Sequence, residues 1–148
     1  MERPHRVANK TISIAAPLIL VLVVLFGVAS LVAGWPHQFG GRGSRANILT
    51  DFVTTGTATS PPLVILVRFG FVAFTVRRRD RLGTVALIAL LPLAGLMAVG
   101  SIGEALAAAT PDVPRLVQFA TGGFGVLAAI LLLLLGVAAL VERRRASG

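Results

Sequence analysis

Long apolar stretches with few charged residues alternate with polar ones along this chain, and the alternation predicts four membrane-spanning helices. The apolar runs cover residues 14–33, 61–76, 82–109 and 117–141. At about 1.5 Å of rise per residue, the first run is about 30 Å long, the thickness of one hydrocarbon core. It exceeds the apolar part of a secretory signal, so we expect it to be retained. The second run reaches only about 24 Å, and we expect the bilayer to thin around it.

The longest polar segment, residues 35–60, joins the first two runs. Its first part is rich in glycine, which predicts irregular structure. Within residues 45–54, the apolar side chains fall on one side of a helix: Ala46, Ile48, Leu49, Phe52 and Val53. This pattern predicts a short helix that lies in the membrane surface or forms a lid over the bundle mouth.

The basic residues are distributed unequally between the two ends of the predicted helices. One side carries ten of them: Arg3, Arg6, Lys10, Arg77, Arg78, Arg79, Arg81, Arg143, Arg144 and Arg145. The opposite loops carry Arg42, Arg45 and Arg115. Basic residues accumulate on the cytoplasmic side of membrane proteins, so the pattern predicts cytoplasmic N and C termini.

Composition agrees with an integral membrane protein that forms a single domain over residues 1–148. Hydrophobic residues make up 55% and charged residues 14%, whereas soluble domains carry about a quarter charged residues. The net charge of +8 does not indicate nucleic-acid binding, because no basic stripe is interleaved with aromatic residues. Arginine is used almost to the exclusion of lysine, beside abundant Ala, Gly, Val and Leu. We take this bias as the mark of a GC-rich genome and expect a bacterial plasma membrane.

Small residues at four-residue spacing predict close packing between the last two helices. They are Ala94 with Ala98, Gly103 with Ala107, and the series Thr121, Gly125 and Ala129. Lipid is as apolar as leucine, so helices in a bilayer associate through such close contacts rather than through burial from water. The overall prediction is therefore an all-α integral membrane protein, a four-transmembrane-helix bundle.

Arg68 stands in the middle of the second run. The aliphatic and phenylalanine residues of this run favour insertion by about 4.5 kcal/mol together, and one central arginine costs about 2.5–3.5 kcal/mol. Insertion of this helix into the bilayer would be only marginally favourable unless neighbouring residues cover the charge of Arg68. We therefore expect Arg68 to face the bundle, on the side of Val64, Val72 and Thr75.

Glu104 is the acidic residue that lies inside an apolar run, and it is the natural partner to test for Arg68. Arg68 lies about 13 Å above the basic loop along its helix, and Glu104 about 34 Å above it, so a direct pair is not expected. Glu104 is expected at the outer mouth, near Gln118, Arg115 or Arg45. The candidate intramembrane polar site thus comprises Arg68, Thr75, Glu104 and Gln118.

The sequence contains no recognisable group of catalytic, cofactor-binding or metal-binding residues. We expect that the protein is not an enzyme and binds no cofactor. The two histidines, His5 and His37, lie on opposite sides of the predicted membrane. Cysteine is absent, which excludes thiolate catalysis and cysteine-ligated metal. The basic residues of the loop and tail are candidate lipid-headgroup contacts: Arg77, Arg78, Arg79, Arg81, Arg143, Arg144 and Arg145.

Two functional hypotheses from different classes follow. The first is a non-catalytic subunit or partner of a membrane complex, either with another membrane protein or as a homo-oligomer in the lipid bilayer. The alternative is a small channel or carrier in which Arg68 contacts an anion or a lipid headgroup. A water-accessible cavity around Arg68 would favour transport, and a conspicuous uncovered face would favour the subunit.

Overall fold

Helices make up most of the part of the chain that the structure describes. The computed structural model describes residues 7–36, 45–107 and 113–147. The helices in order are α1 (Val7–Ala33), the 3-10 turn η2 (Arg45–Asn47), α2 (Ile48–Thr54), α3 (Leu63–Thr75), α4 (Arg81–Leu106) and α5 (Arg115–Ser147). Three of these, α1, α4 and α5, are long and apolar enough to cross a membrane, and α3 is a shorter apolar helix. The predicted all-α class is confirmed for the described residues.

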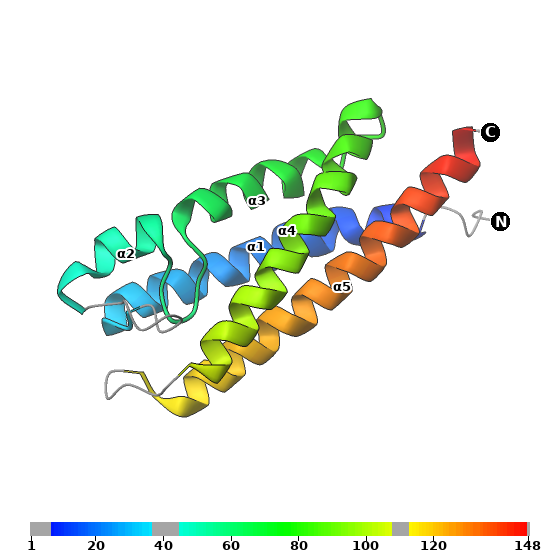
Figure 1. Cartoon of the computed structure of the whole chain (residues 1–148). Helices are drawn as coiled ribbons and strands as arrows, with labels where there is room; N and C mark the ends of the chain where they lie inside the picture. Colours follow the sequence, from blue (N-terminus) through cyan, green and yellow to red (C-terminus); the bar gives the residue numbers. More distant parts are fainter. Residues whose placement is uncertain (1–6, 37–44, 108–112, 148) are drawn as a thin grey trace.

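The four apolar helices run back and forth between two ends of a bundle (Figure 1). We call the end that carries residues 77–81 and 143–145 the basic end, where α1 starts, α3 passes into α4 and α5 finishes. At the other end, the far end, α2 lies beside the end of α1, and α4 passes into α5. The short helix predicted within residues 45–54 corresponds to η2 and α2; residues 37–44 of that loop lie outside the described chain.

The first and the last helices of the chain are longer than predicted. α1 begins at Val7 rather than residue 14, and α5 continues to Ser147 rather than residue 141. The tail contains alanine, glutamate and arginine, which are strong helix formers, so nothing stops α5 at the polar boundary. The third apolar helix of the bundle, α4, ends at Leu106, and residues 108 and 109 of its predicted range lie outside the described chain.

A glycine turn ends α1 at the far end. Gly34 has a positive φ of 69°, which glycine adopts without steric cost. The amide of Trp35 donates to the Ser30 carbonyl at 2.9 Å, and the amide of Gly34 donates to the Leu31 carbonyl at 3.3 Å. This pair of bonds is the Schellman motif, which satisfies carbonyls left without helical donors.

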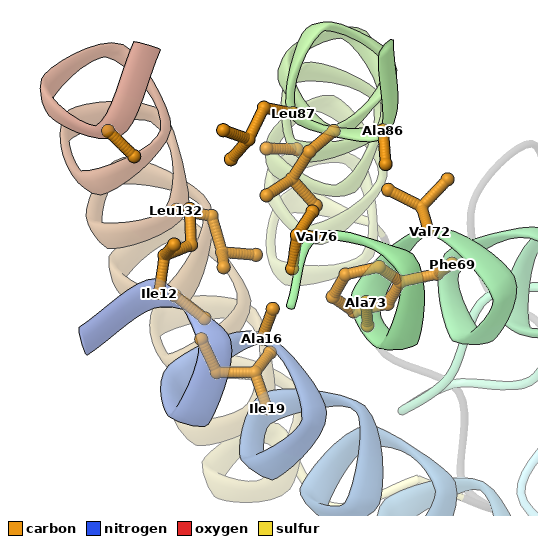
Figure 2. Close-up of a cluster of buried hydrophobic side chains, with 14 of the residues drawn as sticks. Ile12, Ala16, Ile19, Phe69, Val72, Ala73, Val76, Ala86, Leu87 and Leu132 are labelled. Carbon is orange, nitrogen blue, oxygen red and sulfur yellow. The ribbon is translucent and has the colours of Figure 1, made fainter. Parts of the chain in front are cut away.

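The core lies where the four apolar helices meet near the basic half of the bundle (Figure 2). Ile12 of α1, Leu87 and Leu90 of α4, and Leu132 of α5 are fully buried there. The outward faces of the same helices are also apolar, with many exposed leucine, valine and isoleucine side chains. The bundle thus has apolar side chains both inside and outside.

The close packing predicted between the last two helices is present, although several of the residues that form it differ from those predicted. A Cβ at Gly122 would lie 2.6 Å from Ala105 Cβ and 2.8 Å from the Ser101 carbonyl oxygen, and a Cβ at Gly125 would overlap Ser101 Oγ. Gly125 was predicted at this contact between the helices, whereas Gly122 takes the place expected for Thr121. On α4, the residues met are Ser101 and Ala105 rather than the predicted Gly103 and Ala107. Glycine at these positions lets the backbones of α4 and α5 approach closely.

Candidate functional site

Arg143 connects all four apolar helices at the basic end. Its Nε donates to Asn9 Oδ1 of α1 at 2.8 Å, its Nη2 to the Val76 carbonyl at the end of α3 at 2.9 Å, and its Nη1 to Thr84 Oγ1 of α4 at 3.3 Å. The side chain itself belongs to α5. One planar guanidinium with several fixed donors suits this role.

The neighbouring Glu142 binds the first described turn of α1. Its carboxylate accepts hydrogen bonds from the backbone amides of Ala8 and Asn9, at 2.9 and 3.0 Å, and from Asn9 Nδ2 at 2.8 Å. The first amides of a helix have no partner within the helix, and a negative charge near them is favourable. A carboxylate from the end of α5 therefore stabilises the first turn of α1.

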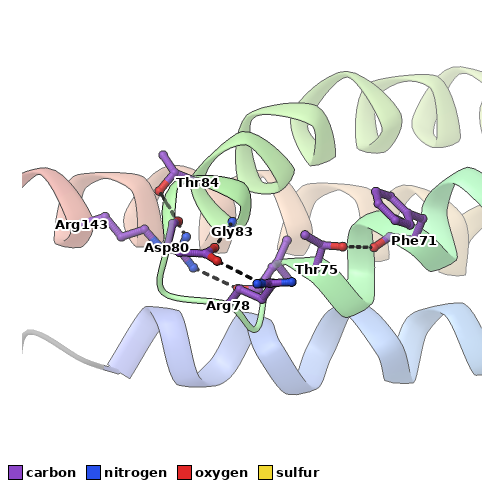
Figure 3. Close-up of polar contacts among 8 residues, drawn as sticks. Phe71, Thr75, Arg78, Asp80, Gly83, Thr84 and Arg143 are labelled. Atoms are coloured by element: carbon purple, nitrogen blue, oxygen red, sulfur yellow. Dashed lines mark hydrogen bonds and ion pairs between the residues drawn. The ribbon is translucent and has the colours of Figure 1, made fainter.

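The turn between α3 and α4 is closed by Asp80, the N-cap of α4 (Figure 3). Asp80 Oδ1 accepts from the Gly83 amide at 3.0 Å, and Asp80 Oδ2 accepts from Arg78 Nε at 3.0 Å. The hydrogen bond from Gly83 lowers the pKa of the Asp80 carboxyl below its ordinary 3.8, and the Arg78 charge acts in the same direction. A carboxylate in this position satisfies an amide that would otherwise lack a partner.

The Asp80→Asn variant is expected to show a weaker dependence of stability on pH. Because the pKa is lowered on folding, the carboxylate stabilises the folded state above pH 3.8, and this contribution is lost as the pH falls through the folded-state pKa. The unfolding midpoint in detergent, measured from neutral to acid pH, should be lower in the variant at neutral pH and converge with that of the wild type in acid. A difference that stays constant over the whole range would contradict this assignment.

Arg77 compensates a proline inside α1. Pro17 has no amide hydrogen, so the carbonyl of Ser13 one turn earlier loses its helical donor. Arg77 Nε donates to this Ser13 carbonyl at 3.2 Å. The Arg77 guanidinium also lies over the Phe74 ring, 5.2 Å from its centroid, a cation–π contact. The hydrogen bond from Arg77 to Ser13 therefore joins the end of α3 to α1.

The seven arginines predicted as lipid-headgroup contacts therefore occupy different environments. Arg143 is turned into the bundle, and its donors are used there. Arg77 and Arg78 each have an identified partner within the chain, whereas Arg79, Arg81 and Arg145 are exposed. Arg144 is exposed and also interacts within the chain. The sequence pattern could not distinguish these seven arginines, because it gives the charge and position of each residue but not the direction in which its side chain points.

Arg68 faces outward, and the prediction that it faces the bundle is wrong. The buried side of α3 consists of Leu66, Phe69, Val72 and Ala73. Arg68 lies on the other side, among the exposed side chains of Val64, Val67 and Phe71. It makes no hydrogen bond or ion pair with any described residue. The prediction assumed that this chain must cover its own charge, whereas the side of α3 that packs inward is the one that carries Leu66 and Phe69.

The other members of the predicted polar site do not gather around Arg68: Thr75 lies at the basic end, and Glu104 and Gln118 lie toward the far end. Thr75 Oγ1 donates to the Phe71 carbonyl of its own helix at 2.6 Å. Gln118 is fully buried near the start of α5, and neither of its amide atoms has a partner among the described residues. Glu104 lies near the end of α4, at the far end of the bundle. The structure does not assemble these residues into one site, nor do the described residues bring three potential metal ligands together.

A cavity of about 410 Å³ lies between the α1–α3 and α4–α5 helix pairs toward the far end. Its apolar walls include Val23, Phe69, Leu93, Leu132 and Phe124, and Phe124 packs edge-on against Phe26 at a centroid distance of 5.2 Å. Its polar lining includes Thr57, Ser101, Glu104 and Thr121. The cavity is therefore apolar over most of its length and polar at the far end.

Sequence reasoning missed both the Arg143 network and the cavity. One signal for the network was present: Glu142 and Asp80 are acidic residues embedded in arginine clusters, where each could serve as an internal partner. The cavity has no local sequence signal, because its lining comes from five helices and a loop. No protein-family model, curated protein or solved structure matches the chain, so the functional inference comes from its own residues.

Proposed function

We propose that this chain is a four-span membrane protein of the bacterial plasma membrane, with both termini in the cytoplasm. Apolar side chains on both the inner and outer faces of the helices support an apolar surrounding. α1 and α4 both run from the basic end to the far end, so α3 must return the chain between them. α3 is 13 residues long and spans only about 20 Å; local thinning of the bilayer accommodates it. The excess of basic residues at one end supports the orientation.

Its proposed role is that of a non-catalytic subunit of a membrane complex, and the observation that supports this role is the exposure of Arg68 on α3. An arginine that faces lipid at the centre of a helix costs about 2.5–3.5 kcal/mol. Arg68 stands there with exposed apolar neighbours, and no described residue of its own chain bonds it. A partner that covers this face would remove that cost. We call the exposed side chains of Val64, Val67, Arg68 and Phe71 the α3 face.

The chemistry of the α3 face favours a different protein over a second copy of this chain. A two-fold dimer through the same face would bring two Arg68 side chains toward each other. The chain's own acidic residue at helix depth, Glu104, lines the cavity and does not lie on this face. The proposed partner is therefore a transmembrane helix that presents an aspartate or glutamate to Arg68, because a paired charge is tolerated within the bilayer.

The carrier hypothesis receives less support. A carrier that used Arg68 as its anion contact would place it beside a water-accessible cavity. The cavity between the helix pairs is lined by other residues, and Arg68 is not among them. Arg68 lies on the outward side of α3, away from the helices that would have to form a pathway.

The Arg68→Leu variant is expected to lose its partner. The wild-type protein, purified from native membranes in a mild detergent, should run as a complex whose mass exceeds that of the single chain. Removal of one member of a buried charge pair costs about 2–5 kcal/mol, so binding should weaken by about 30-fold or more. Arg68→Lys keeps the charge and should retain the partner in part, and Arg79→Leu is a charge-loss control at the basic end. A wild-type protein that purifies alone, or an Arg68→Leu variant that keeps its partner, would overturn the proposal.

A further inference from the structure

The turn between α3 and α4 carries two arginines that no described residue binds. Arg79 and Arg81 are exposed, and neither makes a hydrogen bond or an ion pair with the described part of the chain. Asp80 lies between them in the sequence, but its carboxylate accepts from Arg78 and from a backbone amide of α4. Glu142, the other described acidic residue at the basic end, is bonded to the first described turn of α1. The charges of Arg79 and Arg81 are therefore available to an anion outside the chain.

Arg81 lies on the side of α4 that faces away from the core. The core side of this helix carries Leu87 and Leu90, both fully buried. Because an α-helix has about 3.6 residues per turn, the side opposite to them carries Arg81 and then a series of apolar residues. We call this series the α4 face, and its members are all exposed: Val85, Ile88, Pro92, Leu96 and Val99. The α4 face thus begins beside a positive charge at the basic end and continues as an apolar surface.

Positive charge is more concentrated at this turn than elsewhere at the basic end. Two further basic side chains there are exposed and bonded to no described residue, but Lys10 belongs to α1 and Arg145 to α5. Arg79 and Arg81 lie only two residues apart. Arginine suits phosphate well, because its guanidinium binds two phosphate oxygens through parallel hydrogen bonds. The turn therefore combines the charge and the donors that an anionic head group requires.

We propose that this surface binds an anionic phospholipid, with its phosphate at Arg79 and Arg81 and its acyl chains along the α4 face. From Arg81 to Leu96 the distance along the helix is about 22 Å, enough to follow an acyl chain through one leaflet of about 15 Å. A free phosphate would use the arginines and leave the apolar side chains uncovered. A lipid without net charge would leave the two arginines without a counterion.

The lipid site rests on the proposed placement in a bilayer but not on the partner of Arg68. The α4 face and the α3 face belong to different helices. The proposed function is tested by the mass of the complex that Arg68 holds together, whereas the lipid site is tested by the lipid bound to the chain. A failure of one measurement is therefore distinguishable from a failure of the other.

Three ligands test the contributions of the head group and the acyl chains. Dioleoyl phosphatidylglycerol, dioleoyl phosphatidylcholine and inorganic phosphate are titrated separately onto the detergent-purified protein, and the bound fraction is read by native mass spectrometry. Phosphatidylglycerol is expected to bind about tenfold or more tightly than phosphatidylcholine, because each basic residue near an anionic lipid contributes about fivefold. Inorganic phosphate should not bind at the same concentrations. Equal binding of the two lipids, or binding of phosphate as tight as that of phosphatidylglycerol, would overturn the proposal.

Two double variants with the same loss of charge locate the site. The Arg79→Gln, Arg81→Gln variant is expected to bind phosphatidylglycerol about tenfold or more weakly. The Lys10→Gln, Arg145→Gln variant removes two charges from α1 and α5 at the same end and should keep binding within about twofold. All four side chains are exposed, so neither variant should impair folding. Equal weakening in the two variants would mean that the lipid responds to the total charge of the basic end, and would overturn the assignment.

Photocrosslinking tests where the acyl chains lie. Phosphatidylglycerol that carries a diazirine group in one acyl chain is bound to the detergent-purified protein and irradiated, and the labelled segment is identified by mass spectrometry. The label is expected on α4 around Val85 and Ile88, and it should fall about tenfold in the Arg79→Gln, Arg81→Gln variant. Labelling confined to α1 or α5 would overturn the proposed position of the lipid.

Discussion

The Gly83→Ala variant is expected to have a free energy of unfolding lower by about 3 kcal/mol, near the upper end for one added methyl group in a tightly packed site. A Cβ at Gly83 would overlap the backbone carbonyl of Arg78 and lie 2.9 Å from Arg143 Nη1. The carbonyl belongs to the tight turn between α3 and α4, so only a shift of the backbone can relieve the overlap. Such a shift would also disturb the Asp80 cap and the Arg143 network.

Gly95→Ala is the matched control in the same helix. A Cβ there meets nothing within 4 Å, and alanine is a better helix former than glycine by up to about 1 kcal/mol. Thermal unfolding of both variants in detergent, followed by circular dichroism, should show a lower midpoint for Gly83→Ala and an equal or higher one for Gly95→Ala. Equal losses in the two variants would mean that glycine is needed along α4 in general rather than at this turn.

The Arg143→Leu variant is expected to be less stable by about 2–4 kcal/mol. The substitution leaves Asn9 Oδ1, the Val76 carbonyl and Thr84 Oγ1 without their present donor. Each buried group left without a partner costs about 1–3 kcal/mol, but these groups are only part-buried, so water recovers some of that cost.

Arg145→Leu removes the same charge two residues later from an exposed position and should change the stability by no more than about 0.5 kcal/mol. A double-mutant cycle of Arg143→Leu with Asn9→Ala, measured as unfolding midpoints in detergent, should give a coupling of about 0.5–3 kcal/mol. Additive effects in the cycle, or an equal loss in Arg145→Leu, would show that Arg143 acts only through its charge.

The positions of the helices could be predicted from the sequence because they depend on local pattern. The proline pair before α3 and the arginine cluster after it mark boundaries within a few residues of those observed, whereas the start of α1 and the end of α5 were missed by several residues. The first described turn of α1 is bonded by Glu142 through amides that lie 133 and 134 residues away in the sequence, and no local periodicity encodes such a contact.

For the candidate site, the sequence predicts the energetic cost of Arg68 in the bilayer but not the structure around it. The apolar content of α3 establishes that Arg68 is costly in a bilayer, but it does not determine which molecule reduces that cost. Two arrangements are consistent with the same composition: an arginine covered by its own bundle and one covered by a partner. The large side chains Leu66 and Phe69 pack into the core, and this packing turns Arg68 outward. The cavity depends on where α3 and α4 separate, which is a property of the assembled helices.

The two ends of the bundle are held together by different kinds of interaction. At the basic end one side chain is bonded to three other helices, whereas toward the far end apolar contacts, such as that of Phe26 with Phe124, join α1 to α5 beside the cavity. Hydrogen bonds fix the direction and distance of their partners, and apolar contacts do not. We therefore expect the helices to repack more readily toward the far end than at the basic end.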